Sequence, residues 1–174
     1  ARTFFPESYT SEQLFLAWGV FGGTPYYLDG VDLDDDLGTV IRQSLLSRQG
    51  FLHDEPEYVL RTELTEPNRY FAILKAIAAG NITSNEIAQT VGIAGKQIST
   101  YTQKLERLRL VEREVPVTED KTKSRRGQYR ILDPLFRFWF RFVYGNEDRY
   151  ERLGTDAYEA VIEPALADFV SQGF

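Results

Sequence analysis

The sequence predicts a mainly α-helical chain with a small β-wing, in which a helical subdomain precedes a winged helix-turn-helix and C-terminal helices. Three observations predict this fold. Apolar residues recur at helical spacing along most of the chain. The segment Thr83-Ser84-Asn85-Glu86 has capping-box spacing, and a tight turn at Gly92 separates the helix that it opens from a polar-faced helix. Two short segments of alternating charged and apolar residues then flank a basic loop, as the strands of a wing do.

Residues 1–66 predict a small helical unit. Thr10 and Gln13 have capping-box spacing, and the apolar run after them ends at Gly22-Gly23. Thr24-Pro25 then supplies a cap and a first-turn proline for another short helix. Acidic residues gather where the next helix begins: Asp32, Asp34, Asp35 and Asp36. We interpret them as caps at the positive end of a helix dipole, because the alternative, a divalent-metal loop, lacks the Asp-x-Asp-x-Asp-Gly pattern.

Two further helices complete this unit. Leu37, Val40, Ile41 and Leu45 recur at helical spacing. Pro56 marks the start of the other helix. Its candidate core residues are Tyr58, Val59 and Leu64.

Residues 67–132 predict the winged helix-turn-helix. A first helix begins at Pro67 and ends at Gly80, a second closes at Gly92, and a third runs over residues 95–109. Apolar spacing in the third helix predicts the residues that face the core: Ile98, Tyr101 or Thr102, Leu105 and Leu108. The polar residues are expected to face outward: Lys96, Gln97, Thr100, Gln103, Lys104 and Arg107.

The wing follows the third helix directly. Leu110 to Val117 alternates charged and apolar residues, as a half-exposed strand does. Thr118 to Gly127 is polar and basic and is expected to be a loop, and Gln128 to Leu132 alternates again. A loop of this composition attracts phosphate backbones, because each Lys or Arg displaces a condensed counterion.

Residues 133–174 predict a C-terminal helical extension. Asp133-Pro134 is a cap with a first-turn proline. The segment from Leu135 to Tyr144 alternates aromatic residues with arginine and fits either a strand or a helix. We favour a helix because of the cap and because a helix buries Phe136, Phe140 and Val143 together. Apolar residues from Val161 to Phe169 indicate one more helix.

Composition excludes several classes of protein. Apolar residues make up 43% of the 174 residues, enough to bury a core. The chain has no cysteine, which excludes disulfides and thiolate metal sites. Its one histidine, His53, cannot hold zinc without several carboxylate partners, and a lone histidine is usually a surface or capping residue. No apolar run is long enough to span a bilayer and no signal peptide is present, so we expect no membrane partner and a cytoplasmic location.

Charge is distributed unevenly. Residues 93–130 hold ten basic and five acidic residues, a net charge of +5, whereas the rest of the chain carries −11. Such a basic island in an acidic chain is the electrostatic footprint of a nucleic-acid interface. The alternative interpretation is a charged hairpin that is simply solvated.

The sequence lacks the motifs of a self-sufficient enzyme. It has no Gly-x-x-x-x-Gly-Lys-Ser/Thr phosphate loop and no Gly-x-Ser-x-Gly elbow. No serine in a suitable motif accompanies His53, so no nucleophile–base pair is predicted. We therefore expect no catalytic residue, no metal and no cofactor in this chain.

Four segments together resemble a known family. They are Phe-Gly-Gly-Thr-Pro-Tyr-Tyr-Leu (21–28), Glu-Pro-Asn-Arg-Tyr-Phe (66–71), Val-Glu-Arg-Glu-Val-Pro-Val-Thr-Glu (111–119) and Arg-Phe-Trp-Phe-Arg-Phe-Val-Tyr (137–144). In this order they resemble the C-terminal half of an archaeal AAA-type ATPase family. In that family a P-loop ATPase core precedes a helical lid, a winged helix and a nuclease-like domain.

The resemblance implies that this chain is part of a longer protein. Residues 1–66 would be the lid, and residues 133–174 would begin a truncated nuclease-like domain. Gly23 and Pro25 match the Gly-x-Pro lid motif, which would lie beside the nucleotide in the parent protein. ATP and Mg²⁺ would belong to the missing N-terminal core, which is also an implied partner. The sequence also explains these residues as an ordinary turn between helices.

Two functions compete on this basis. The first is binding of double-stranded DNA by the helix of residues 95–109, with Lys96, Gln97 and Thr100 near base edges. Cationic residues would hold phosphates in this hypothesis: Lys104, Arg107, Lys121, Lys123, Arg125 and Arg126. The second is a protein-interaction or regulatory winged helix that couples the ATPase core to a partner or forms a homodimer, because Glu106, Glu112 and Glu114 would repel DNA if they faced it.

Overall fold

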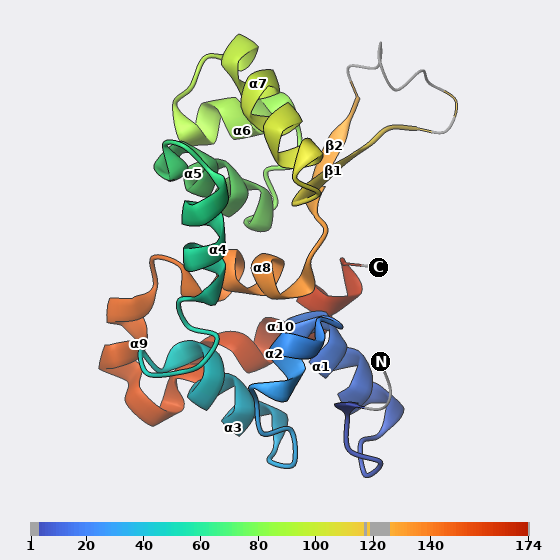
Figure 1. Ribbon diagram of the computed structural model, residues 1–174, viewed down its shortest axis with the longest axis vertical. Coiled ribbons are helices and arrows are strands. Elements are labelled where there is room, and N and C mark those ends of the chain that lie inside the picture. The colour runs from blue at the N-terminus through green and yellow to red at the C-terminus, as the bar shows by residue number, and fades with distance from the viewer. Residues whose placement is uncertain (1–3, 117, 119–125, 174) are drawn as a thin grey trace. The chain divides into compact units, whose positions relative to one another are not determined.

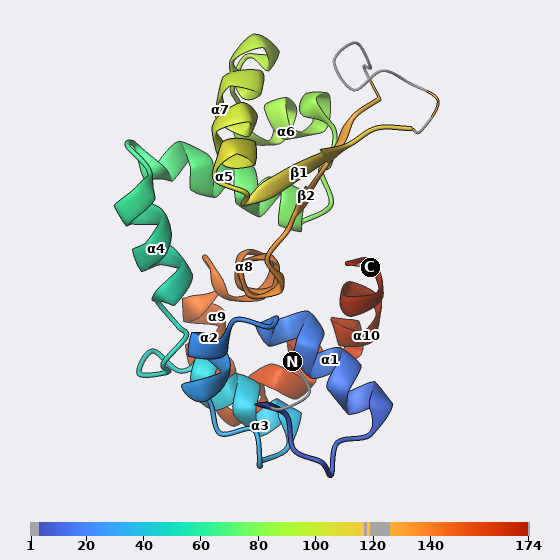
Figure 2. The same cartoon turned by 45° about the vertical axis from the view of Figure 1, so that its right-hand side comes forward.

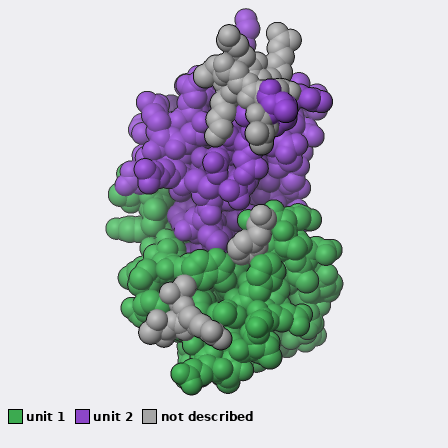
Figure 3. All heavy atoms as spheres, turned by 90° about the vertical axis from the view of Figure 1, so that its right-hand side faces the viewer, with its two compact units in different colours: residues 1–62, 142–174 green, residues 63–141 purple. Residues whose placement is uncertain are grey.

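The computed structural model describes residues 4–116, 118 and 126–173. These residues are mainly helical with a two-stranded antiparallel sheet, which confirms the predicted balance of helix and strand (Figure 1). The chain forms two compact units (Figure 3): residues 1–62 with 142–174, and residues 63–141. The boundaries predicted from the sequence lie instead at residues 66 and 132.

Local sequence signals explain the first helices of the first unit. Helix α1 (Ser11–Phe21) begins with the predicted capping box, in which the Thr10 hydroxyl accepts from the Gln13 N–H and the Gln13 side chain accepts from the Thr10 N–H. Helix α2 (Pro25–Asp29) begins at the predicted proline. Helix α3 (Leu37–Ile41) starts where the Asp36 carboxylate accepts a 3.1 Å hydrogen bond from the Thr39 N–H. The acidic residues therefore include a helix cap, as expected.

The π-helical turn η2 (Arg42–Leu46) continues α3, and helix α4 (Glu55–Glu63) follows after a loop. On α4 the predicted core position Tyr58 is wrong, because its side chain is 71% exposed. The buried residues Pro56, Leu60 and Leu64 are spaced four apart and define one helix face. Tyr58 lies two residues from that row and so points to the other side of the helix.

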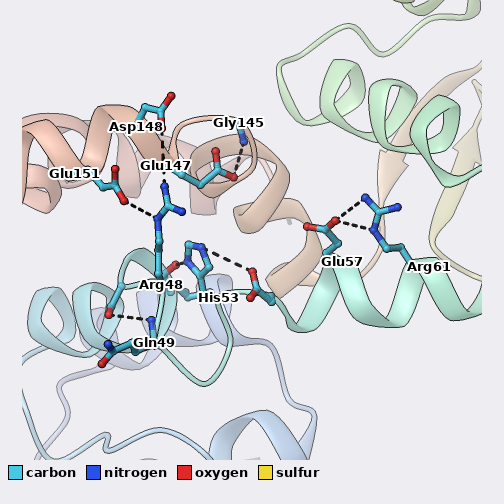
Figure 4. A network of polar contacts seen from close by, with 12 residues as sticks. Arg48, Gln49, His53, Glu57, Arg61, Gly145, Glu147, Asp148 and Glu151 are labelled. Atoms are coloured by element: carbon cyan, nitrogen blue, oxygen red, sulfur yellow. Dashed lines mark hydrogen bonds and ion pairs between the residues drawn. The ribbon is translucent and has the colours of Figure 1, made fainter.

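The C-terminal residues of the first unit form a series of short helices. They are the π-helical turn η3 (Trp139–Val143), which begins in the other unit, α9 (Glu147–Leu153), the 3₁₀ turn η4 (Gly154–Asp156), the π-helical turn η5 (Tyr158–Ile162) and α10 (Glu163–Ser171). Helix α10 packs on α1, where a Cβ added at Gly19 would overlap Val170. Salt bridges also join the N-terminal and C-terminal residues of this unit. Arg42 lies 2.5 Å from Glu159, and Arg48 lies 2.6 Å from Glu151, as Figure 4 shows.

His53 is buried rather than a surface residue, and it serves as a helix cap. Its Nδ1 lies 2.7 Å from the Leu45 carbonyl, near the end of η2 (Figure 4). A carbonyl oxygen only accepts hydrogen bonds, so Nδ1 carries the proton and donates it. This bond satisfies one of the carbonyls that a helix leaves unpaired at its C-terminal end.

The second unit contains α5 (Pro67–Ala78), α6 (Ser84–Val91), α7 (Gly95–Arg107), β1 (Val111–Glu114), β2 (Gln128–Ile131) and α8 (Pro134–Phe138). Helix α6 begins with the predicted capping box of Thr83 and Glu86 and ends at Gly92, whose φ of 70° is left-handed. Figures 1 and 2 show α6 and α7 beside the hairpin of β1 and β2. Aromatic side chains of the core meet edge to face, with the Phe71 ring 5.8 Å from Phe140.

The hairpin pairs Val111 with Ile131 and Glu114 with Gln128 in antiparallel register. Strand β1 is shorter than the predicted segment 110–117, because Pro116 has no N–H to donate to a ladder. A third backbone segment joins the hairpin on its other edge. The Tyr129 N–H donates a 2.7 Å hydrogen bond to the Ile82 carbonyl, and Thr83 forms an isolated bridge with Gln128.

The aromatic and arginine-rich segment after Asp133 is helical, as favoured over a strand. The Asp133 carboxylate accepts a 3.1 Å hydrogen bond from the Phe136 N–H and caps α8. Leu135, Phe138 and Trp139 are each at most 2% exposed. The segment therefore buries its aromatic residues as a helix that continues into a π-helical turn.

A candidate nucleic-acid interface

Helix α7 has one face in the core and one face in solvent. Ile98, Thr102 and Leu105 are fully buried, which settles the alternative between Tyr101 and Thr102 in favour of Thr102. The Thr102 hydroxyl lies 3.3 Å from the Tyr129 hydroxyl of β2, so this face of α7 rests on the hairpin. The predicted outward residues are exposed except for Lys104, which is half-buried: Lys96, Gln97, Thr100, Gln103, Lys104 and Arg107.

The beginning of α7 exposes backbone donors next to a cation. Ala94 occupies the N-cap and provides no side-chain hydrogen bond to the first turn. Gly95 and Lys96, the first residues of the helix, are exposed. Backbone N–H groups at the positive end of a helix attract anions, and the Lys96 ammonium adds a full charge beside them. The Gln97 N–H is engaged by the Ala94 carbonyl at 2.8 Å, so Gly95 and Lys96 provide the remaining donors of the first turn.

The acidic residue of α7 lies away from this polar face. At about 100° per residue, Glu106 is rotated by roughly 100° from Arg107 and by roughly 140° from Tyr101. Lys104 and Gln97 instead lie within roughly 60° of Tyr101. Glu106 therefore occupies the flank of α7 opposite Tyr101, Lys104 and Gln97, and the exposed stripe is cationic and polar.

Sequence reasoning missed a polar and aromatic cluster where α5 meets α7. The Arg69 guanidinium of α5 donates a 2.7 Å hydrogen bond to the Tyr101 hydroxyl of α7. The Tyr70 ring meets the Tyr101 ring edge to face with centroids 5.2 Å apart. The hydrogen bond to Tyr101 raises the pKa of Arg69. Tyr101 was predicted only as an alternative core residue, and no sequence pattern links it to Arg69, which lies 32 residues away.

The outward face of the hairpin is ion-paired. Arg130 contacts Glu112 at 3.2 Å and Glu114 at 2.5 Å, so two of the carboxylates expected to repel DNA are partly neutralised by one guanidinium. Arg126 lies two residues before β2 and is exposed. The other predicted phosphate contacts of the loop, Lys121, Lys123 and Arg125, lie outside the described residues.

Gly23 and Pro25 belong to the first unit and are both exposed. A Cβ added at Gly23 would overlap the Trp18 indole of α1, so packing on that ring explains the glycine. Pro25 begins α2. Their structural roles are those of a turn between helices.

The described part of the chain has no group of three or more metal-binding side chains. Likewise, none of its helices has the length and apolar character needed to cross a membrane. Burial raises the pKa of Tyr150 to about 12, and its hydroxyl donates to the Phe142 carbonyl, which identifies it as a structural group.

Comparison with known proteins reveals an archaeal relative. The chain is similar to an uncharacterized protein of Methanocaldococcus jannaschii, with 35% identity over 147 residues. The match covers 83% of this chain and 32% of the relative, so the chain spans about a third of that protein's length. No family model matches the chain, and no solved structure matches it significantly.

Proposed function

We propose that residues 67–132 form a winged helix-turn-helix that binds double-stranded DNA through α7. The order of elements supports this fold: α5, the extended segment at Ile82, α6, α7 and then the hairpin. In such a fold α7 is the recognition helix and β1 and β2 form the wing. The bridge between Thr83 and Gln128 supports it further, because it joins the segment before α6 to the last strand.

The exposed stripe of α7 is the observation that carries the proposal. Lys96, Lys104 and Arg107 alternate along it with the uncharged hydrogen-bonding residues Gln97 and Thr100. Cations supply affinity by releasing counterions from phosphates, whereas Gln pairs with adenine and Lys with guanine in a major groove. Glu106 lies on the flank of α7 opposite Lys104 and Gln97, so its carboxylate does not face a phosphate backbone bound along these two residues.

We also propose that this module works within a larger archaeal protein of the AAA-type ATPase class. The four family-like segments support this context, and the archaeal relative is about three times as long as the region it shares with this chain. ATP and Mg²⁺ would then be bound by a separate ATPase core, and the chain described here would contribute no catalytic residue.

A protein-interaction module is the second candidate. The observation that favours it is the acidic character of the hairpin's outward face, where Glu112 and Glu114 both pair with Arg130. That face suits a basic partner better than a phosphate backbone. A second copy of the chain or the ATPase core is the partner that this alternative requires.

Mobility shift with a random pool of DNA duplexes tests the proposed function. The purified chain should retard duplex at low salt, and the affinity should fall as salt rises, because phosphate contacts release counterions. A pool recovered from the bound fraction should be enriched in particular sequences if Gln97 and Lys96 read bases. No retardation at low salt would reject DNA binding and favour the protein-interaction module.

A further inference from the structure

The contact between Arg69 and Tyr101 fixes the direction of a hydrogen bond. Arginine has only donors, so the Tyr101 oxygen must accept the 2.7 Å bond from Arg69. The phenolic proton of Tyr101 is then directed to some other acceptor. Among the described residues, the Tyr101 hydroxyl forms a hydrogen bond with Arg69 alone. The phenolic proton of Tyr101 therefore remains available to a ligand.

The same contact leaves most of the guanidinium unused. An arginine has five N–H donors, and one of them is engaged by Tyr101. Arg69 is exposed, and its central carbon lies 6.0 Å from the centre of the Tyr101 ring. The half-buried Tyr101 phenol and the exposed Arg69 guanidinium lie side by side. Together they form a donor set for a tetrahedral oxyanion, because one such group offers several oxygen acceptors to both.

The pair of Arg69 and Tyr101 lies next to the exposed stripe of α7. Tyr101 lies on the same side of the helix as Gln97 and Lys104, one turn from each. Arg107 is close enough to influence the pKa of Tyr70, whose ring packs on Tyr101. The cationic groups of the stripe thus continue across Tyr101 onto the N-terminal turn of α5. Glu66 is the opposing charge here, since it acts on both Arg69 and Tyr70.

We infer that Arg69 and Tyr101 together bind one phosphodiester of the DNA backbone at the α5 flank of α7. Arg69 supplies the charge and orients the phenol, and the Tyr101 hydroxyl donates its proton to a phosphate oxygen. The inference rests on the proposed function and deepens it. It adds a DNA-backbone contact from α5, a helix for which the sequence predicted no DNA contact.

Two variants separate the two donors. Tyr101→Phe keeps the ring against Tyr70 and removes only the hydroxyl, whereas Arg69→Ala removes the charge and its hydrogen bond. Tyr70→Phe is the matched control, because this neighbouring tyrosine loses a hydroxyl that does not contact Arg69 in the described structure. Fluorescence anisotropy of a labelled random duplex, repeated over a salt series, measures affinity and its salt dependence. Thermal unfolding verifies that each variant is folded.

Tyr101→Phe should weaken duplex binding about three- to tenfold at fixed salt, the effect of one hydrogen bond, and should leave the slope of log affinity against log salt unchanged. Arg69→Ala should weaken binding at least as much and reduce that slope by about one. Tyr70→Phe should bind within about twofold of the unaltered chain, which is less than the effect of one hydrogen bond.

Three outcomes contradict the inference, and they are distinguishable. If the unaltered chain binds duplex and both Arg69→Ala and Tyr101→Phe bind as tightly, the phosphodiester contact is rejected and the proposed function stands. If Tyr70→Phe weakens binding as much as Tyr101→Phe, the effect arises from packing of the aromatic pair and not from a donated proton. If the unaltered chain does not bind duplex, the proposed function fails and this inference fails with it.

Discussion

Side chains on α7 differ in what they contribute to folding although they lie within a few turns of one another. Leu105 is fully buried, whereas Gln97 is exposed. Burial of an apolar side chain stabilises the folded state in proportion to the area removed from water, and truncation also leaves a cavity. An exposed polar side chain makes neither contribution.

We therefore expect Leu105→Ala to lower the free energy of unfolding by roughly 2–5 kcal/mol, as for other buried leucines. Gln97→Ala should change it by less than about 0.5 kcal/mol, because surface substitutions of this kind are nearly neutral. Urea denaturation followed by circular dichroism measures both. Equal losses would show that the two faces of α7 are assigned wrongly.

Predictions for individual residues are confirmed where a sequence pattern arises from one local interaction. The hydroxyl-to-Gln and hydroxyl-to-Glu spacings after Thr10 and Thr83 are local, and both capping boxes are confirmed. Tyr58 was misplaced because apolar character alone does not fix the direction of a side chain, whereas the capping alternative for His53 is confirmed. The Arg69–Tyr101 contact joins residues 32 positions apart, and no periodicity within one helix encodes such a contact.

At the level of elements, helix α8 begins at the Asp133 carboxylate, whose charged form is disfavoured by burial. Burial raises the pKa of Asp133, although hydrogen bonds from the Phe136 and Leu135 N–H groups act in the opposite direction. The folded state therefore holds a proton on Asp133 more tightly than the unfolded chain does. Stability from this group is present at low pH and is lost as the pH rises through the folded-state pKa.

Replacement of Asp133 by Asn tests this directly. Asparagine is as good an N-cap as aspartate, and it removes the buried charge. Asp133→Asn should be more stable than the unaltered chain at pH 7, and the difference should shrink at pH 3. Asp133→Ala is the control, since loss of the cap should cost about 1 kcal/mol. Urea denaturation at both pH values decides, and a less stable Asn variant at pH 7 would contradict the assigned cause.

Element boundaries were predictable where a residue forbids continuation. Pro67, Gly92 and Pro134 mark helix ends or starts that the structure places at the same positions. The π-helical turns were not predictable, because their hydrogen bonds differ from those of an α-helix by one residue and leave the apolar pattern nearly unchanged. The segment 139–143 is such a case.

At the level of the whole molecule, the chain's order in sequence does not give its grouping in space. Residues 142–174 join residues 1–62 through the packing of α10 on α1 and the ion pairs of Arg42 and Arg48. Apolar spacing in α10 shows which face is buried and not which distant helix covers it. For this reason residues 133–174 were predicted as one extension, whereas the structure divides them between the two units.

The uneven charge of the chain also acts at this scale. The chain carries a net charge of −6 while residues 93–130 carry +5. A duplex is therefore attracted to one region of a protein that repels it elsewhere, and affinity should depend on where a positive charge is removed. If only the net charge of the protein mattered, removal of any arginine or lysine would lower the affinity for a duplex equally.

If DNA binds at α7, the salt dependence of binding depends on charges of this helix and not on charges elsewhere, which two matched double variants distinguish. Lys104→Ala with Arg107→Ala removes two charges from the stripe, and Arg149→Ala with Arg152→Ala removes two exposed charges from α9 in the first unit. The first pair should reduce the slope of log affinity against log salt by about two and weaken binding, whereas the second should leave both nearly unchanged. Equal effects of the two pairs, or no effect of the first, would contradict binding at α7.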